Sequence, residues 1–581
     1  MAVGGHRSGW GWASIPAVAF VLLIFVVPVL LLSTRSITEP EVGWQNFERL
    51  LSQPGYVEII FRTIWISALA TAIALVIGYP IAYFMVNGGK KVRIFLTIAV
   101  VAPYLTSILL RSFSWMVLLG RNGVVNGLLA TMGLEPLTML FTPIAVVVSL
   151  AHYLLPLMIL PIAATMRSVD SSRLKAAASL GSGPLQAFVR IYMPLTKPGV
   201  QIGVVLSFVY GVGAFVIPAL LGGDDGRMLG SLIHSAIDQS ADYALASAAA
   251  LVLAALVILI VIAFQALTGM STTELAGRSQ AQSSKVKHRR RSWEASSRHR
   301  IVSAFGRAAE LVDRTGITRH PRIGEIATIV LGALILAPQL IVIPISFAST
   351  RALVFPPLGW STQWYAEFFT PEWLEPLSVS VRIAAITTVV AVILGTLVAL
   401  GVVRGRSRGL GALTSTLMMV PLLFPLVVAA AGFYLVFLRI GLVDTELGIV
   451  LAHISIAIPF VFGTVSASLR GLNPAYENAA ASLGANRVTQ LRRIVVPLML
   501  PAIATGAFFA FLTSFDESTI AVFLSGVRTK TLPRRMCEGL AFESDPTIAV
   551  IAVFTIVATA VLWGGFVIMR RISRKRTGAV R

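Results

Sequence analysis

The chain has 581 residues, of which 56% are hydrophobic and only 13% are charged. Soluble globular domains carry roughly 25% charged residues, so the composition excludes an ordinary soluble protein and indicates an integral membrane protein. Lys and Arg outnumber Asp and Glu by 47 to 26, a formal net charge of +21, and the single cysteine, Cys537, excludes a disulfide scaffold or a multi-cysteine metal site.

Twelve apolar runs are long enough to cross a bilayer, which takes about 20 residues in a helix. They lie at roughly 14–33, 63–85, 94–119, 143–166, 200–221 and 244–268, and then at 324–348, 378–402, 413–438, 448–469, 500–524 and 546–569. The sequence therefore predicts an all-α integral membrane protein with about 12 transmembrane helices in two six-helix halves, residues 1–270 and 324–581.

The basic residues collect in alternate loops. Examples are the residues Lys90, Lys91 and Arg93, the residues Arg404, Arg406 and Arg408, and the basic tail from Arg570 to Arg576. Because cytoplasmic loops carry the excess of Lys and Arg, this pattern predicts that both termini are cytoplasmic. Basic loops beside anionic lipid also account for the net charge, so no nucleic-acid partner is expected.

Residues 271–323 separate the halves and are polar and strongly basic, with Lys, His and Arg filling most of 285–291. They are expected to form a cytoplasmic linker. Ile301, Phe305, Ala308 and Val312 recur at helical spacing, which fits a short helix on the membrane surface. A simple tether is the equally weighted alternative.

The halves carry a repeated segment. Residues 176–181, Ala-Ala-Ala-Ser-Leu-Gly, recur as residues 479–484, a shift of 479 − 176 = 303 positions. In the same register Ile191 and Pro194 fall on Ile494 and Pro497. The spacing predicts a short alanine-rich helix, a glycine break, a second short helix and a proline at the membrane. An exposed, small-sided helix of this kind suits a groove on a partner protein.

These segments resemble the EAA loop of the permease subunits of type I binding-protein-dependent ABC importers. The matching positions are Ala176, Ala177, Gly181, Ile191 and Pro194 in the first copy and Ala479, Ala480, Gly484, Ile494 and Pro497 in the second. The resemblance implies the type I permease fold and docking of each loop on a cytoplasmic ATPase. The family's leading Glu is replaced by Lys175 and Asn478, with Glu477 one residue earlier, so the ion pair of that Glu is not carried over.

Four further stretches resemble spermidine/putrescine-type permeases: residues 110–115, 213–218, 355–360 and 513–517. This resemblance implies a fused permease pair in a bacterial inner membrane that moves a small, cationic solute such as a polyamine. It also implies two copies of a separate ATPase, which hold ATP and Mg, and a periplasmic or lipid-anchored solute-binding protein. Ferric iron, thiamine and amino-phosphonates are alternative solutes of the same family.

Charged residues inside a span need a reason, because each costs about 2.5–3.5 kcal/mol at the bilayer centre. Asp516 and Glu517 lie within the eleventh predicted span. They are candidates for a cation pathway, or for a structural ion pair with Arg111 or Arg382. Neighbours on a helix diverge by about 100°, so a continuous helix would not turn both carboxylates toward one pathway.

Aromatic residues of the fifth and eleventh predicted spans are further pathway candidates, because ring faces attract ammonium groups. They are Tyr210, Phe215, Phe511 and Phe515; packing or interface anchoring is the alternative for each. His152 and His453 occupy matching Leu-Ala-His contexts, where a hydrogen-bonded packing role is favoured over a metal or proton relay.

The sequence has no Gly-x-x-x-x-Gly-Lys-[Ser/Thr] phosphate-binding loop. The chain is therefore expected to bind no cofactor and to be no enzyme. A twelve-span secondary transporter is the alternative function, but its Gly-x-x-x-Asp-Arg-x-Gly-Arg signature is not found after the second predicted span. The repeated segments favour the importer.

Overall fold

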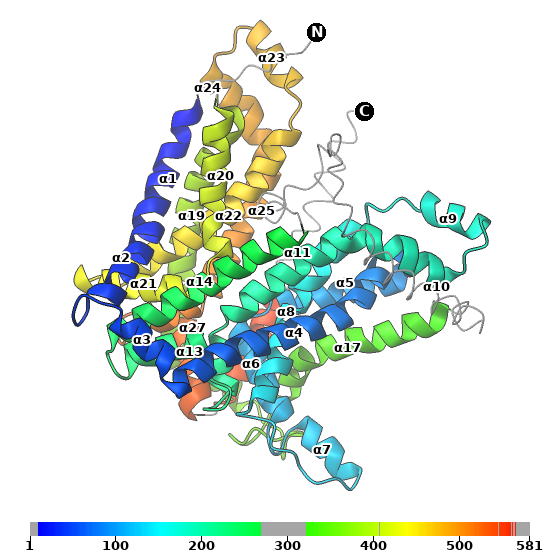
Figure 1. The fold of residues 1–581 in the computed structure, drawn as a ribbon, viewed down its shortest axis with the longest axis vertical. Coiled ribbons are helices and arrows are strands. Elements are labelled where there is room, and N and C mark those ends of the chain that lie inside the picture. The colour runs from blue at the N-terminus through cyan, green and yellow to red at the C-terminus, as the bar shows by residue number, and fades with distance from the viewer. Residues whose placement is uncertain are drawn as a thin grey trace.

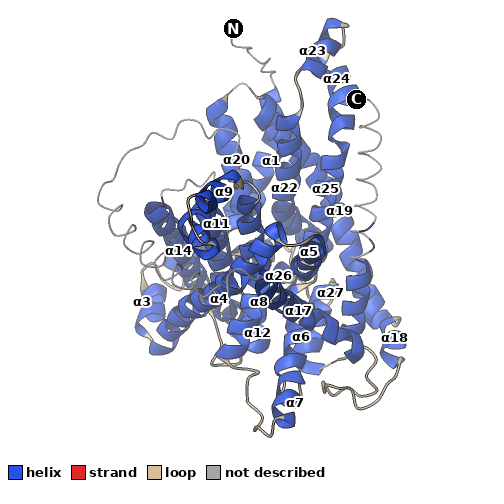
Figure 2. Cartoon of the chain, turned by 90° about the vertical axis from the view of Figure 1, so that its right-hand side faces the viewer, coloured by secondary structure: helices blue, strands red, loops and turns tan. Residues whose placement is uncertain are grey.

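The computed structural model describes residues 10–268, 321–405, 407–543 and 545–558, together with residues 561 and 564. Every element in this part of the chain is a helix, apart from one isolated bridge between Ala348 and Trp360 (Figures 1 and 2). The predicted all-α fold is confirmed. The proposed helix at residues 301–312 and nearly all of the proposed linker lie outside the described residues.

In the first half, the first span is a continuous run of η1 Trp10–Ser14, α1 Ile15–Val21, η2 Leu22–Val26 and α2 Val27–Thr38. The later spans are α4 Pro54–Asn87, α5 Lys90–Tyr104 with α6 Ile108–Leu119, α8 Pro143–Met166, α11 Met193–Val212 and α14 Tyr243–Thr268. Shorter helices connect them: α3 Gln45–Ser52, α7 Val124–Thr131, α9 Ser172–Ser179, α10 Pro184–Ala187, η3 Phe188–Tyr192, α12 Val216–Leu221 and α13 Leu229–Asp238.

The second half repeats this order. Its spans are α17 Pro321–Ile345, α19 Pro371–Arg404, α20 Arg408–Leu423 with α21 Leu426–Arg439, α22 Glu446–Gly471 and α25 Val496–Phe515. Its connecting helices are α18 Gln363–Phe368, α23 Ala475–Ser482, α24 Arg487–Gln490, η5 Leu491–Val495, α26 Thr519–Leu524, α27 Leu532–Glu538 and η6 Gly539–Glu543. The twelfth predicted span is described only as the apolar helix Thr547–Ala558.

Four of the predicted spans are not straight helices. Within the described residues, nine helices could cross a membrane, or eleven if each of two bent pairs counts as one span. The predicted spans 94–119 and 413–438 bend by 104° and 95°, next to Pro103 and Pro425, because a proline interrupts helical hydrogen bonding. The predicted spans 200–221 and 500–524 also break, after Val212 and Phe515.

Three helices form the core of each half: α4, α8 and α11 in the first, α19, α22 and α25 in the second. Matched glycines allow their close packing. A Cβ on Gly78 would lie 3.1 Å from Ile159 Cγ1, and one on its counterpart Gly395 would lie 2.6 Å from Val461 Cβ. Small residues at such contacts are typical of helix packing in membranes.

The halves interlock because each exchanges its first span with the other. The N-terminal span packs on α19 and α21, and a Cβ on Gly401 would lie 2.8 Å from the backbone N of Ser14. In return α17 packs on α5 and α6. His152 Nε2 is 3.0 Å from the carbonyl oxygen of Ile335 on α17, which agrees with the packing role expected for this histidine.

The two repeated segments form the tips of the molecule. We call residues 172–192 and 475–495 the first and second paired loop. Figure 1 shows the helix sets diverging from the region of α13 and α27 toward these tips, with α9 at one and α23 at the other. We call the side with the paired loops the loop end and the side with α13 and α27 the far end.

Candidate functional site

The paired loops have the same backbone. Helices α9 and α23 are eight residues long and end at glycines with positive φ, +84° at Gly181 and +82° at Gly484. The N–H of Ser182 donates to the Ala177 carbonyl at 3.0 Å, and Ala485 donates to Ala480 at 2.9 Å. This is the Schellman motif, which needs a left-handed residue and therefore favours glycine.

The starts of both helices are also matched. The backbone N–H of Ser172 donates to Asp170 Oδ1 at 2.9 Å, and that of Ala475 donates to Asn473 Oδ1 at 3.0 Å. Ser172 Oγ donates to Asp170 Oδ2 at 2.6 Å, and these hydrogen bonds lower the pKa of the Asp170 carboxyl. Each short helix is thus fixed at both ends by local contacts.

The structure places all ten predicted loop residues in these matched motifs. Ala177 and Ala480 are buried, whereas Ala176 and Ala479 are exposed. After each glycine, a helical turn and a π-helical turn carry Ile191 or Ile494 into the next span, and Pro194 and Pro497 lie in the first turn of α11 and α25.

Sequence reasoning missed the most exposed apolar side chains of the loops. Leu180 is 88% exposed and Leu483 is 89% exposed. Each lies directly before the glycine with positive φ, too far from a hydrophobic core to be buried by it. Their recurrence at the same place in both copies was the signal that could have identified them.

The loops differ in how they are held. Glu477 in α23 forms an ion pair with Arg404 at the end of α19. At the corresponding place in the first half, Asn87 Nδ2 donates to the Tyr192 hydroxyl at 2.8 Å. Glu477 lies next to Asn478, the position where the resemblance places the family's leading Glu. It therefore forms its ion pair within this chain, and this pair belongs to the second loop only.

A cavity of about 280 Å³ lies between the halves. Polar and aromatic side chains from both sides line it: Tyr104, Arg111, Tyr153, Tyr210 and Phe215 from the first half, and Phe424, Phe460, Phe509, Asp516 and Glu517 from the second. We call it the central cavity. Of the six predicted pathway residues, Tyr210, Phe215, Asp516 and Glu517 line it.

Phe511 and Phe515 do not belong to the cavity lining among the described residues. Their rings stack on each other instead, with centroids 5.9 Å apart. They lie one turn apart on α25, so their side chains share a face of that helix. In this structure they contribute packing on α25.

Asp516 and Glu517 lie at the break between α25 and α26, and not inside a continuous helix as expected. The break lets both line one cavity. Glu517 accepts hydrogen bonds from the backbone N–H of Thr519 at 2.8 Å and of Ala521 at 3.1 Å. Its Oε2 is 3.6 Å from His453 Nε2. Glu517 therefore caps α26 and is occupied by structural contacts.

Asp516 faces the first half across the cavity, toward Ser107 and Arg111. Arg382, the other candidate for an ion pair with the carboxylates, instead pairs with Glu446 at 2.6 Å. The guanidinium of Arg111 lies over the ring of Tyr153, 4.6 Å from its centroid. Asp516 is thus the carboxylate available to the cavity.

Aromatic contacts join the two halves at Phe215, which lines the central cavity. The Phe215 ring packs on His234 and on Phe523, with centroids 5.0 and 5.8 Å apart, and His234 is 5.2 Å from Phe523. On the loop side a larger cavity of about 900 Å³ shares Tyr104, Leu422, Phe424, Phe460 and Phe509 with the central one. The larger of the two cavities therefore lies on the loop side of the central one.

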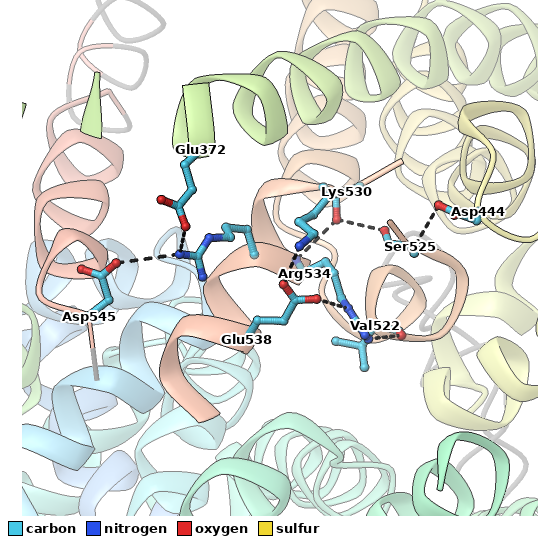
Figure 3. A network of polar contacts seen from close by, with 11 residues as sticks. Glu372, Asp444, Val522, Ser525, Lys530, Arg534, Glu538 and Asp545 are labelled. Atoms are coloured by element: carbon cyan, nitrogen blue, oxygen red, sulfur yellow. Dashed lines mark hydrogen bonds and ion pairs between the residues drawn. The ribbon is translucent and has the colours of Figure 1, made fainter. Parts of the chain in front are cut away.

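A polar network braces the far end of the second half (Figure 3). Asp444 accepts hydrogen bonds from the backbone N–H of Gly526, Arg528 and Thr529 at 2.8–3.0 Å. Arg535 Nη2 is 2.6 Å from Glu372 Oε1 and 4.0 Å from Asp545 Oδ2. Sequence reasoning missed Asp444, because no local pattern links it to a loop more than 80 residues later.

The sequence matches the family described as "Binding-protein-dependent transport system inner membrane component" in two places, residues 74–273 and 391–577. The chain belongs to this family. The two matches cover corresponding parts of the halves and confirm the predicted duplication. As a member of the family, the protein is a multi-pass inner-membrane component of an importer and not an enzyme.

Similar proteins include both permeases of polyamine transport systems. The spermidine/putrescine transport system permease protein PotB of Escherichia coli (strain K12) is 32% identical over 222 residues, 37% of this chain and 80% of PotB. PotB of Haemophilus influenzae is 33% identical over 260 residues, 43% of this chain and 91% of PotB. PotC of the same species is 32% identical over 218 residues, 37% of this chain and 83% of PotC. The predicted resemblance to polyamine permeases is confirmed.

A solved structure with similarity to part of the chain is a bacterial ABC transporter involved in the import of the acidic polysaccharide alginate. The TM-score is 0.41 at 20% sequence identity, over 44% of this chain and 92% of that one.

Proposed function

We propose that this chain alone forms the membrane pathway of an ATP-driven importer, with both paired loops in the cytoplasm, where they receive the movement of two copies of an ATPase. The observation that carries this proposal is the pair of identical loop folds at the tips of diverging halves. Each presents an exposed leucine, Leu180 or Leu483, on a short, rigidly capped helix.

The arrangement supports a lever mechanism. When ATP draws the two ATPases together, the paired loops approach each other and the wide cavity on the loop side narrows. Because each first span packs on the opposite half, the halves pivot as interlocked bodies. The pivot separates Phe215 from Phe523 and opens the central cavity at the far end, where a solute-binding protein delivers its cargo. Hydrolysis restores the observed state.

The solute that fits the central cavity is a small amine cation, and polyamines are the class carried in the names of PotB and PotC. Asp516 supplies a carboxylate, and the rings of Tyr153, Tyr210 and Phe460 line the same space. An ammonium group that leaves water needs such partners, since both carboxylates and ring faces stabilise it. Ferric iron, thiamine and amino-phosphonates stay alternative solutes.

Co-purification from native membranes tests the ATPase partnership against a secondary transporter. We expect the tagged wild-type chain to bring down an ATPase with a phosphate-binding loop, and we expect the co-purified complex to hydrolyse ATP. The double variant Leu180→Asp/Leu483→Asp should lose both, because a charge replaces each apolar contact. The control is Val527→Asp, a 91% exposed residue at the far end, which should retain them. An ATPase that stays bound to the double variant would contradict the docking role.

A further inference from the structure

Arg111 is a buried cation of the central cavity that lacks the contacts such a charge needs. Its side chain lines the cavity and is only 5% exposed, yet Nε and Nη1 have no hydrogen-bond partner among the described residues. The guanidinium lies over the ring of Tyr153, 4.6 Å from the ring centroid. Burial of a charge is costly unless an opposite charge or hydrogen bonds compensate it, so Arg111 calls for an anionic partner.

The two carboxylates of the cavity do not serve as that partner in this structure. Glu517 accepts hydrogen bonds from two backbone amides of α26. Asp516 lines the cavity from the other half, but it forms no ion pair with Arg111 within 4.0 Å in the described part of the chain. The cavity therefore has a positive group on one side and a negative group on the other, and these groups do not neutralise each other.

The position over Tyr153 prepares the guanidinium to bind an oxyanion. A guanidinium that stacks on a ring uses its face for that contact. Its N–H groups lie in the plane of the group, so they remain available as donors. Carboxylate and phosphate-like groups match the spacing of these donors and accept two parallel hydrogen bonds from them. An oxyanion is therefore the solute group that would compensate Arg111.

We propose that the solute of the central cavity is a small zwitterion, with its ammonium group at Asp516 and an oxyanion, a carboxylate or a phosphonate, at Arg111. The inference rests on the proposed function, since it keeps an amine at Asp516, and it narrows that amine to one that also carries an acidic group. A solute with ammonium groups alone leaves Arg111 uncompensated and adds a like charge to the cavity. Because Arg111 and Asp516 belong to different halves, the bound zwitterion also joins the halves.

Calorimetric binding to the purified full-length chain in lipid nanodiscs tests this with matched solutes. The zwitterions are γ-aminobutyrate and aminopropylphosphonate. Putrescine replaces the acid by a second ammonium group, and butyrate lacks the ammonium group. We expect the wild type to bind at least one zwitterion about tenfold more tightly than putrescine or butyrate, because each of these loses a charged contact. The zwitterion that binds more tightly distinguishes a carboxylate solute from a phosphonate solute.

Variants of Arg111 should move the two classes of solute in opposite directions. Arg111→Met should weaken zwitterion binding by about tenfold and tighten putrescine binding, since a positive charge leaves the cavity. Arg111→Lys keeps the charge but not the planar donor group, so its zwitterion affinity should be intermediate. The control is Arg382→Met, because Arg382 pairs with Glu446 outside the cavity lining. Melting temperatures show whether each variant is folded, and a folding defect would weaken both classes together.

The outcomes separate this inference from the amine function. If the wild type binds putrescine more tightly than either zwitterion, the acidic group is wrong and the amine pathway stands. If a zwitterion binds but Arg111→Met weakens it no more than Arg382→Met does, Arg111 is not its partner and the inference is wrong. Equal binding of butyrate and γ-aminobutyrate, unchanged binding by Asp516→Asn, or no binding of any of these solutes would overturn the amine at Asp516, on which both proposals depend.

Discussion

The two halves break the same span at the same place but fill the break with different chemistry. In the first half the break after α11 is Gly213, Ala214 and Phe215; in the second half the break after α25 is Asp516, Glu517 and Ser518. Both breaks border the central cavity. The two halves share the backbone of this break, but the first half places the aromatic ring of Phe215 there and the second half places the carboxylates of Asp516 and Glu517. The two sides of the central cavity are therefore chemically different.

The far-end loops differ in the same manner. Phe141 and Asp444 occupy matching positions with positive φ, +63° and +58°. The Asp444 carboxylate binds three backbone amides of the loop at 526–529, whereas Phe141 has no group that could do so. The same backbone turn is therefore stabilised by hydrogen bonds to the Asp444 carboxylate in the second half, whereas the Phe141 side chain forms no such hydrogen bonds in the first half.

The largest expected effect tests what the two halves share. Gly181→Val and Gly484→Val should each lower ATP-driven uptake by about tenfold or more, because a non-glycine residue in the left-handed region costs roughly 1–2 kcal/mol and the helix end must rearrange. A Cβ meets nothing within 4 Å at either site, so the chain should still insert. Gly55→Val, at an open position without positive φ, is the control. Normal uptake by both loop variants would refute the coupling role of the loops.

The next effect separates the two breaks. Glu517→Ala should destabilise the protein by about 1–3 kcal/mol, because the partly buried amide of Thr519 and the buried amide of Ala521 lose a charged acceptor. Glu517→Gln keeps an acceptor and should lose less. The matching change in the first half, Ala214→Gly, removes no hydrogen bond. Thermal unfolding in detergent gives the comparison, and equal melting temperatures for Glu517→Ala and the wild type would rule out the capping role.

A smaller effect is expected at the far end. Asp444→Ala should cost about 1–2 kcal/mol, since three amide hydrogen bonds to a carboxylate are lost at a partly solvated site. Hydrogen exchange should speed up at residues 526–529. The same change at the matched position, Phe141→Ala, should leave exchange at residues 222–227 nearly unchanged. Unaltered exchange at 526–529 would mean that the loop is fixed by other contacts.

The smallest effect concerns the second paired loop. Arg404→Gln removes the ion pair with Glu477, and partly exposed pairs contribute up to about 1 kcal/mol. Uptake should fall less than twofold and should become less sensitive to salt. Asn87→Ala, at the corresponding place in the first half, provides the comparison. A loss as large as that of Gly484→Val would show that the ion pair transmits movement.

Patterns of local sequence predicted the features that depend on local physics. Hydropathy located the spans, and the glycine of each repeated segment predicted the helix break, because a left-handed C′ residue follows from its neighbours alone. The bend at Pro425 and the end of α25 at Phe515 were not predicted. Hydropathy averaged over a window reports the length of an apolar run and not whether the helix through it is continuous. That omission also misplaced Asp516 and Glu517 on one helix.

Long-range features had no local signature. The exchange of first spans depends on packing between segments hundreds of residues apart, as between Ser14 and Gly401. Sequence named Arg111 as a possible partner of the carboxylates, but its position over Tyr153 emerges only from the fold. Whether Phe511 or Tyr210 turns toward the cavity is likewise decided by helix rotation, which the neighbours set.

Cross-linking measures the lever most directly. Leu180→Cys and Leu483→Cys, each in a Cys537→Ser background, would be treated with a bifunctional maleimide in inside-out membrane vesicles that contain the ATPase. We predict that both positions cross-link to the ATPase and that ATP changes the distance between them. Labelling of either cysteine only from the outside of intact cells, or cross-linking of neither, would contradict the account.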